Sequence, residues 1–182
     1  MYIIKSKDNE IALRPMLEDD TNNIVTWRNN PRVRNNFIWQ KTLTESIHLN
    51  WIKSMISTGK AVQFIIVNLN RGGVMEDIGS VYFSDIDYEH HKAEYGIFIG
   101  VDKAVGCGYG TIACKLMCQY GFETLKLHKI FLRVFTNNLR AIRSYEKAGF
   151  NHEGLLRDDV CIDGTYRDIA LMSLINTEIL SK

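Results

Sequence analysis

The sequence predicts a mixed α/β fold, in which a mostly antiparallel sheet is flanked by helices and contains one strand–helix–strand crossover. Alternating apolar runs at residues 61–68 and 78–86 indicate neighbouring strands, and a third run, 92–101, ends in a glycine-rich turn. A helical pattern follows that turn, and then another alternating run, 129–136. A doubly wound sheet would repeat its crossovers, so the order favours a layered α/β fold with a single one.

The N-terminal part is predicted to be mainly helical. Residues 10–15 form a short first strand, and the acids at 18–20 mark the start of a helix that ends near the "NNP" turn at 29–31. Thr42 and Glu45 have the spacing of a capping box. They precede a second helix, whose predicted apolar face is Ile47, Trp51, Ile52 and Met55.

The remaining connections follow from turn residues. A turn containing Arg71, Gly72 and Gly73 joins the first two long strands. The crossover helix covers 110–125, and the helix at 138–149 ends at a glycine. Strands around 160–163 and 166–175 flank a hairpin turn made by Asp163 and Gly164. Because there are only two prolines and no linker-like segment, we expect residues 1–182 to form a single domain.

Composition excludes several classes of protein. A chain of 182 residues, 46% hydrophobic and 24% charged, is ordinary for a soluble globular protein. The charged N-terminus "MYIIKSKDNE" lacks the apolar region of a signal peptide, and no apolar run approaches the roughly 18 residues of a membrane span. A net charge of +1 argues against a nucleic-acid binder. The sequence thus predicts a cytoplasmic protein that contacts neither nucleic acid nor membrane.

The distribution of charge and the spacing of the cysteines limit the kinds of ligand that the chain is expected to bind. Residues 21–44 and 124–145 contain basic residues and no acids, and two such stretches favour anionic ligands. The four cysteines lack the spacing of a disulfide framework or a zinc site, so we expect reduced thiols. The segment "SDIDYEHH" is better explained as a polar connection between strands than as a metal site, and no metal is predicted.

The turn "VGCGYGT", residues 105–111, lies between a strand and a helix, where free backbone amides bind a phosphate. A Walker loop would need a lysine after the last glycine, and Thr111 stands there. A dinucleotide fold would need G-x-G-x-x-G and an acid about 20 residues later, and this chain has neither. Both nucleotide interpretations therefore fail on chemistry.

A second motif indicates the ligand. "VGCGYGT" followed about 30 residues later by "NNLRAIRSYEKAGF" resembles the two acetyl-CoA motifs of the GCN5-related N-acetyltransferase (GNAT) superfamily. "IALRPMLEDD" resembles the first strand and helix of that family. The segment from "EGLL" to "MSLI" resembles the closing hairpin of its ribosomal-protein alanine and amino-sugar branches. The chain departs from the family at the first turn position, where Val105 replaces an arginine or glutamine.

This resemblance implies acetyl-CoA as co-substrate and no metal. The turn would hold the pyrophosphate through Val105, Gly106, Cys107, Gly108, Tyr109, Gly110 and the cap residue Thr111. The preceding strand would pair with the pantetheine arm through the main chains of Phe98, Ile99 and Val101. Asn138, Arg143 and Lys147 would make further cofactor contacts.

The resemblance also assigns the catalytic residues. Tyr145 matches the general acid, and a phenol with a pKa near 10 stays protonated at neutral pH and can protonate the departing thiolate. Glu94 is the candidate base, acting directly or through water, and His91 is a weaker candidate. Amine deprotonation could also need only a water chain, so the base is left open.

The acceptor is predicted from the N-terminal helices. "TWRNNPRVRNNF" and "TESIHLNWI" are similar to acetyltransferases of nucleotide-linked 4-amino sugars, as in pseudaminic acid synthesis. The residues assigned to acceptor binding are Trp27, Arg28, Asn29, Arg34, His48 and Trp51. Arginines suit a diphosphate, and tryptophan suits a base or sugar face.

Other acceptors and a different class remain open. The chain could acetylate the N-terminus of a ribosomal protein, an antibiotic or another small amine. A polyamine would require acids, and residues 21–44 contain none. A non-catalytic acyl-CoA-binding module is the alternative from a different class. A homodimer is expected because dimers are common among the proteins that the chain resembles.

Overall fold

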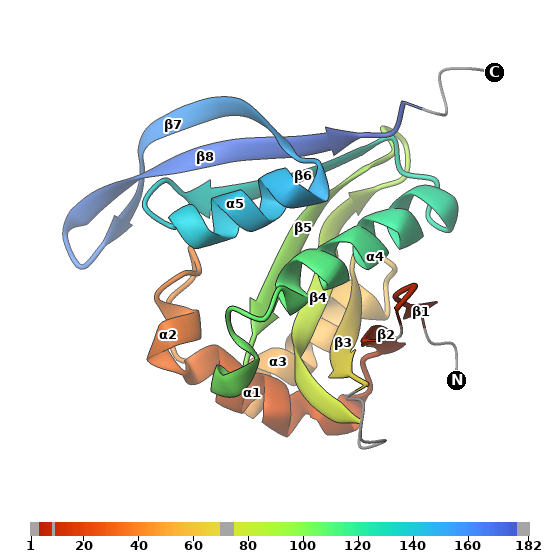
Figure 1. The fold of residues 1–182 in the computed structure, drawn as a ribbon. Coiled ribbons are helices and arrows are strands. Elements are labelled where there is room, and N and C mark those ends of the chain that lie inside the picture. Colours follow the sequence, from red (N-terminus) through yellow and green to blue (C-terminus); the bar gives the residue numbers. More distant parts are fainter. Residues whose placement is uncertain (1–3, 9, 70–74, 178–182) are drawn as a thin grey trace.

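The computed structural model describes residues 4–8, 10–69 and 75–177, and their strands form one eight-stranded sheet (Figure 1). The strands are β1 (Ile4–Lys5), β2 (Ile11–Pro15), β3 (Val62–Asn68), β4 (Glu76–Asp87), β5 (Lys92–Ile99), β6 (Lys129–Phe135), β7 (Asn151–Ile162) and β8 (Thr165–Ile175). Their order is β1-β2-β3-β4-β5-β6-β8-β7. Only β5 and β6 pair in parallel within the described sheet, which confirms the predicted fold with its single crossover.

Helices pack on both faces of this sheet. They are η1 (Glu18–Asp20), α1 (Thr21–Asn29), α2 (Pro31–Arg34), α3 (Glu45–Trp51), η2 (Ile52–Ile56), η3 (Asp102–Ala104), α4 (Tyr109–Glu123) and α5 (Leu139–Ala148). Successive side chains of β2 point to opposite faces of the sheet and so belong to two separate parts of the core. Ile11 and Leu13 pack on the face that α4 covers, and Ala12 packs on the face that α1 and α2 cover. Figure 1 shows α4 and α5 on one side and α1 to α3 below and behind the strands.

The helical N-terminal part differs from the prediction in its boundaries. The side chain of Thr44, not Thr42, caps α3 by accepting a hydrogen bond from the Ile47 amide, so the predicted capping box is wrong. Thr44 has extended backbone angles, which suit an N-cap. Ile47 is 43% exposed, while His48 is buried, so the buried face of this helix is rotated from the predicted one.

The closing hairpin is longer than predicted. β7 begins at Asn151, directly after Gly149 ends α5 in the left-handed region, and the hairpin extends beyond the other strands (Figure 1). Asp163 and Gly164 have φ values of 49° and 77°, which confirms the predicted turn. The turn predicted at residues 71–73 lies outside the described residues.

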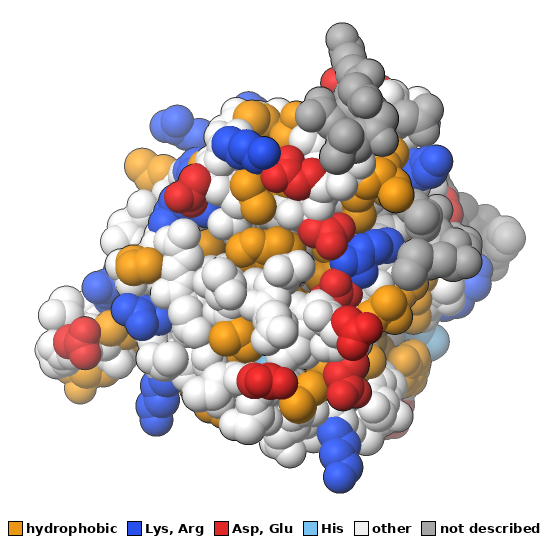
Figure 2. All heavy atoms as spheres, turned by 90° about the horizontal axis from the view of Figure 1, so that it is seen from below, with side chains coloured by type: hydrophobic (Ala, Val, Ile, Leu, Met, Phe, Trp, Pro, Cys, Tyr) orange, Lys and Arg blue, Asp and Glu red, His pale blue; other side chains and the backbone are white. Residues whose placement is uncertain are grey.

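The face seen from below the view of Figure 1 carries mixed charge. Figure 2 shows a row of acidic side chains along one side of this face, with Lys and Arg scattered around it. No helix in the described part of the chain is long and apolar enough to cross a membrane.

Candidate active site

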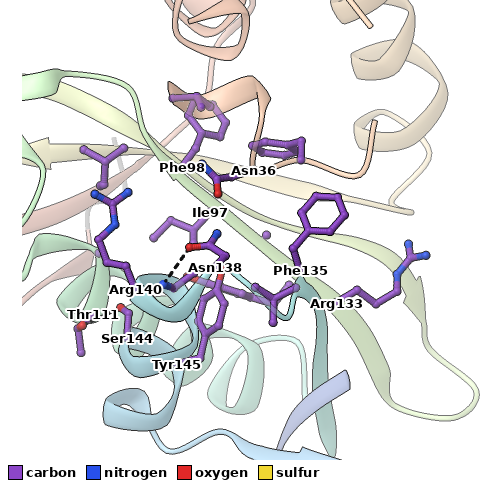
Figure 3. A pocket seen from close by; sticks show the side chains of 18 of the residues that line it. Asn36, Ile97, Phe98, Thr111, Arg133, Phe135, Asn138, Arg140, Ser144 and Tyr145 are labelled. Carbon is purple, nitrogen blue, oxygen red and sulfur yellow. Dashed lines mark hydrogen bonds between the residues drawn. The ribbon is translucent and has the colours of Figure 1, made fainter. Parts of the chain in front are cut away.

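The site begins where two parallel strands separate. β5 and β6 pair only from Lys92–Lys129 to Glu94–Phe131. β5 then continues to Ile99 beside β4, and β6 continues to Phe135 beside β8. A cavity of about 660 Å³ lies in this opening, lined by β5, β6, the glycine turn, α5 and the segment after α2 (Figure 3). Its volume is typical of a small-molecule site.

The glycine turn forms one end of the cavity. Gly106 and Gly108 both have a φ of 84°, in the left-handed region that only glycine adopts without strain. Gly108 is the N-cap of α4, so the helix begins at Tyr109 and Thr111 is not the cap, contrary to the prediction. The first amides of α4 have no helical partners and can bind an anion there. Of the predicted turn residues, all but Cys107 line the cavity.

The main chain of β5 offers fewer free groups than predicted. The Gly100 amide donates to the Ile78 carbonyl at 2.8 Å, which defines a hydrogen-bonded pair of the β4–β5 ladder. Because such pairs alternate with open ones, the main chain of Phe98 bonds to β4, while the groups of Ile97 and Ile99 point away from β4. The Val101 amide also donates to Ile78. The Ile99 carbonyl accepts a hydrogen bond from Arg32 Nη2 at 3.2 Å. The structure therefore favours the main chain of Ile97 and the Ile99 amide over Phe98 and Val101 for main-chain contacts.

α5 brings Asn138 and Tyr145 to the cavity, opposite Ile97 and Phe98 (Figure 3). Asn138 is the N-cap of α5: its Oδ1 accepts a hydrogen bond from the Ala141 amide at 3.2 Å, which leaves its NH₂ group for a ligand. Tyr145 contacts Tyr95 edge to face, with ring centroids 6.0 Å apart. Burial raises the pKa of Tyr145, so the phenol is protonated throughout the neutral range.

Further residues of α5 line the cavity. Arg143 and Lys147 are there as predicted, and the prediction missed Arg140 and Ser144. The Ser144 Oγ lies 2.8 Å from the Thr111 Oγ1 and joins α5 to the first turn of α4. A signal for Arg140 was present in the sequence, because it belongs to the acid-free stretch 124–145.

Glu94 lines the cavity but is already paired. Its two carboxylate oxygens accept hydrogen bonds from Nε and Nη2 of Arg133, at 2.9 and 3.1 Å. The bonds to Glu94 raise the pKa of Arg133 despite its partial burial. The role of Glu94 as a base stays a prediction, and Arg133 is a partner that sequence reasoning missed. His91 does not line the cavity.

None of the six predicted acceptor residues lines the cavity. Trp27 packs edge to face on Phe98, at a centroid distance of 6.4 Å, and occupies the space beside Gly100. Asn29 binds both main-chain groups of Leu43 and so fixes the segment after α2. These side chains have structural contacts that the sequence pattern did not reveal.

The other predicted acceptor residues also make contacts outside the cavity lining. Buried His48 lies with Nδ1 3.0 Å from the Thr21 hydroxyl, and its ring stacks on Trp51. Arg34 lies in α2, partly exposed. Arg28 packs on Phe37, which does line the cavity. Trp51 packs edge to face on Tyr82, at a centroid distance of 6.3 Å, and Tyr82 also lines the cavity. Arg28, Trp27 and Trp51 therefore lie behind lining rings, and the acceptor contacts stay a prediction.

The end of the cavity away from the glycine turn is built by other residues. We call it the acceptor end, and it comprises Phe37, Ile38, Trp39, Tyr82, Ser84, Asp85, Glu94 and Arg133. Asp85 has a φ of 49° at an irregularity in β4, which turns its side chain out of the regular ladder. Sequence reasoning named only Glu94 of this set, because the set depends on the pairing of β4, β5 and β6.

The described residues show no cluster of His, Cys, Asp or Glu that could hold a metal ion. All four cysteines are free; Cys114 and Cys118 are buried in α4, and Cys107 and Cys161 are exposed. Hydrogen bonding to Cys114, together with burial, raises the pKa of the Cys118 thiol. These two cysteines therefore act as core residues.

The separated strands, the glycine turn and α5 together define an α/β acyltransferase fold. A family model described as an acetyltransferase (GNAT) domain matches residues 10–151. The chain belongs to this family, and it is an N-acetyltransferase whose co-substrate is acetyl-CoA, as the sequence motifs predicted.

Two curated relatives share part of the chain. A spermidine N(1)-acetyltransferase from Vibrio cholerae serotype O1 is 34% identical over 120 residues, covering 63% of this chain and 69% of the relative. A spermidine N(1)-acetyltransferase from Escherichia coli K12 is 36% identical over 107 residues, covering 59% of this chain and 57% of the relative. Neither relative is named for an amino sugar.

A solved structure covers nearly the whole chain. It is the crystal structure of a Vibrio cholerae spermidine N-acetyltransferase in complex with CoA and spermine, with a TM-score of 0.83 and 26% identity. The match covers 94% of this chain and 99% of that one. This agreement confirms the predicted fold over almost its full length.

Proposed function

We propose that this chain transfers the acetyl group of acetyl-CoA directly to a primary amine of a small acceptor. The observation that carries the proposal is the cavity between β5 and β6, which joins a glycine turn at one end to Glu94 and Arg133 at the other. The thioester supplies the acetyl group, and the cavity leads from the cofactor residues to the acceptor end.

The residues at the glycine turn fit the cofactor. Gly106 and Gly108 are both left-handed, a conformation in which turn amides can bind a pyrophosphate, and Arg140, Arg143 and Lys147 add positive charge to the cavity lining. The open main chain of Ile97 is suited to pair with the pantetheine arm and to polarise a carbonyl.

Tyr145 is the proposed acid. It lines the cavity between Asn138 and the aromatic rings that hold it, and its raised pKa keeps the proton available. The hydroxyl can donate this proton to the departing thiolate. Glu94 is the proposed base, acting on the amine directly or through water, and the pairing with Arg133 fixes the position of its carboxylate.

The acceptor itself is the finer part of the proposal. The amino-sugar interpretation has no direct support from Trp27, His48 and Trp51, because none of them lines the cavity. The names of the two relatives favour a polyamine such as spermidine. The N-terminus of a protein and a small-molecule antibiotic remain acceptors to test.

A thiol-release assay tests the proposal. Purified protein and acetyl-CoA are incubated with spermidine, nucleotide-linked amino sugars, peptides with N-terminal alanine or serine, and aminoglycosides. Thiol release above background with one acceptor class supports the transferase. If every acceptor stays at background while acetyl-CoA still raises Tm, the chain is a non-catalytic acyl-CoA-binding module.

The predicted homodimer also remains a proposal. Light scattering coupled to size-exclusion chromatography gives the molar mass directly, and 20.9 kDa would show a monomer.

A further inference from the structure

Arg28 carries a buried charge without a hydrogen-bonded partner at one of its nitrogens. The Cζ of Arg28 lies 3.3 Å from the centroid of the Phe37 ring, a cation–π contact. Its Nη1 is fully buried and has no hydrogen-bond partner among the described residues. A guanidinium has five N–H donors, and a buried donor left without an acceptor is costly. This arrangement therefore calls for a compensating anion.

Other arginines of the chain show how such a charge is usually compensated. Three of them pair with carboxylates: Arg14 with Asp20 and Asp77, Arg32 with Asp102, and Arg133 with Glu94. Burial lowers the pKa of Arg28 to about 10. It still carries its full charge at neutral pH.

Arg28 lies directly behind the wall of the acceptor end. Phe37, on which it stacks, and Tyr82, whose hydroxyl feels its charge, both line the cavity. The ring of Tyr82 fills the space that a side chain at Gly96 would occupy, so it lies against β5 beside Ile97. The uncompensated charge is therefore next to the part of β5 where the two strands separate.

The acceptor end does not have the excess of negative charge that would favour binding of a polycation. Arg133 binds both oxygens of Glu94, and Asp159 and Asp85 also interact with Arg133; of these three carboxylates, Glu94 and Asp85 line the cavity. The two lining carboxylates thus already face one guanidinium, and Arg28, behind the wall, adds a second positive charge. A site for a polyamine would instead present an excess of carboxylates.

We propose that Arg28 determines the charge preference of the acceptor, so that an amine whose molecule also carries a carboxylate or phosphate is preferred and a polycation is disfavoured. The proposal rests on the transferase function above and deepens it. The acidic group would occupy the acceptor end against Phe37 and Tyr82 and compensate the guanidinium behind them. The relatives' polyamine would lack that group and would meet repulsion.

Matched acceptors test this preference. Putrescine and 4-aminobutyrate share a four-carbon chain but carry an ammonium or a carboxylate at the far end. Glucosamine and glucosamine 6-phosphate differ by a phosphate. We expect the wild-type protein to have a higher kcat/KM for the acidic member of at least one pair. A preference for 4-aminobutyrate indicates a carboxylate, and a preference for glucosamine 6-phosphate indicates a phosphate. Arg28→Gln should reduce that ratio about 10- to 100-fold, mainly through KM of the acidic acceptor.

Controls separate charge from folding. Arg28→Lys keeps the charge and should retain most of the preference. Arg157→Gln removes an exposed charge on β7, outside the cavity lining, and should change nothing. Acetyl-CoA binding, followed by its effect on Tm, should be the same in all variants.

Two results would overturn the proposal. One is wild-type protein that uses putrescine or spermidine at least as well as both acidic acceptors; the other is an equal ratio in wild type and Arg28→Gln. If no amine supports thiol release, the transferase function fails first. Calorimetric titration with glucosamine 6-phosphate and 4-aminobutyrate then decides about Arg28: binding of either that weakens in Arg28→Gln supports its role, and no binding, or equal binding, refutes it.

Discussion

Arg133 binds both carboxylate oxygens of Glu94 at the point where β5 and β6 separate. Glu94 is the last residue of β5 that pairs with β6, and Arg133 lies two residues beyond its partner Phe131. The ion pair therefore bridges the two strands at the start of the cavity. It gives a way to separate a structural role of Glu94 from a catalytic one.

Glu94→Gln and Arg133→Gln each break this pair. If Glu94 acts as a base, Glu94→Gln should lower kcat about 10-fold or more, while Arg133→Gln should lower it much less. Both should reduce stability by similar amounts, about 1 kcal/mol, because the pair is partly exposed. Steady-state kinetics and urea unfolding measure the two effects, and equal kcat values in the two variants would leave Glu94 as a structural residue.

Tyr145→Phe removes the proposed acid and keeps its packing on Tyr95 and Phe150. We expect kcat to fall about 10- to 1000-fold with acetyl-CoA binding little changed. Tyr166→Phe is the matched control, because Tyr166 is 63% exposed on the hairpin. Thiol release measures turnover, and wild-type rates in Tyr145→Phe would remove the assignment.

Gly108→Val tests the glycine turn. Gly108 has a φ of 84°, and a β-branched residue cannot adopt this conformation without a cost of about 1–2 kcal/mol. The turn should rearrange, and acetyl-CoA affinity should fall about 10-fold or more. Gly154→Val is the control, since a Cβ there meets no atom within 4 Å and its φ is not positive. Isothermal titration calorimetry with acetyl-CoA checks both, and equal affinities would contradict the cofactor assignment.

Gly100→Ala tests the packing role of Trp27. A Cβ at Gly100 would overlap the Trp27 ring, so the variant should lose about 1–3 kcal/mol of unfolding free energy. Trp27→Leu in the same chain should restore part of that loss by making room. Denaturant unfolding of the single and double variants measures this coupling. Purely additive effects would show that Trp27 can move aside, and would reopen an acceptor role for it.

The lowered pKa of Asp20 predicts that the free energy of unfolding decreases at acidic pH. Burial raises its pKa, but hydrogen bonds from Arg14 and the Leu17 amide lower it further, so the net pKa lies below the usual value. Because the folded pKa is below the unfolded one, the stabilisation is present above the unfolded value of about 3.9 and is lost as pH falls through the folded value.

Asp20→Asn should therefore cost about 2–3 kcal/mol at pH 7 and progressively less below pH 4, in urea unfolding at a series of pH values. Asp19→Asn, an exposed neighbour, should behave like wild type. A deficit in Asp20→Asn that stays constant from pH 7 to about 2.5 would contradict this account.

Much of the fold follows from local patterns. The alternating runs, the glycine after α5 and the Asp163–Gly164 turn all appear in the structure where the sequence indicated them. These features depend on residues that are close in the chain. The start of α3 was predicted wrongly because both Thr42 and Thr44 are residues that can cap a helix, and local sequence does not distinguish them.

The sequence by itself determined the family, the acetyl-CoA co-substrate and the position of the glycine turn at the cavity, because a glycine turn and the start of the next helix are local motifs. Only the tertiary structure decided the acceptor part. The sequence pattern assigned Trp27, His48 and Trp51 to a ligand, but none of the three lines the cavity; His48 is buried, and the two tryptophans are half-buried against other aromatic rings. Asp85, Glu94 and Arg133 meet only because three strands pair in one register and then separate. Burial depends on the whole packed chain, so the unpaired nitrogen of Arg28 could not be predicted from its neighbours in sequence.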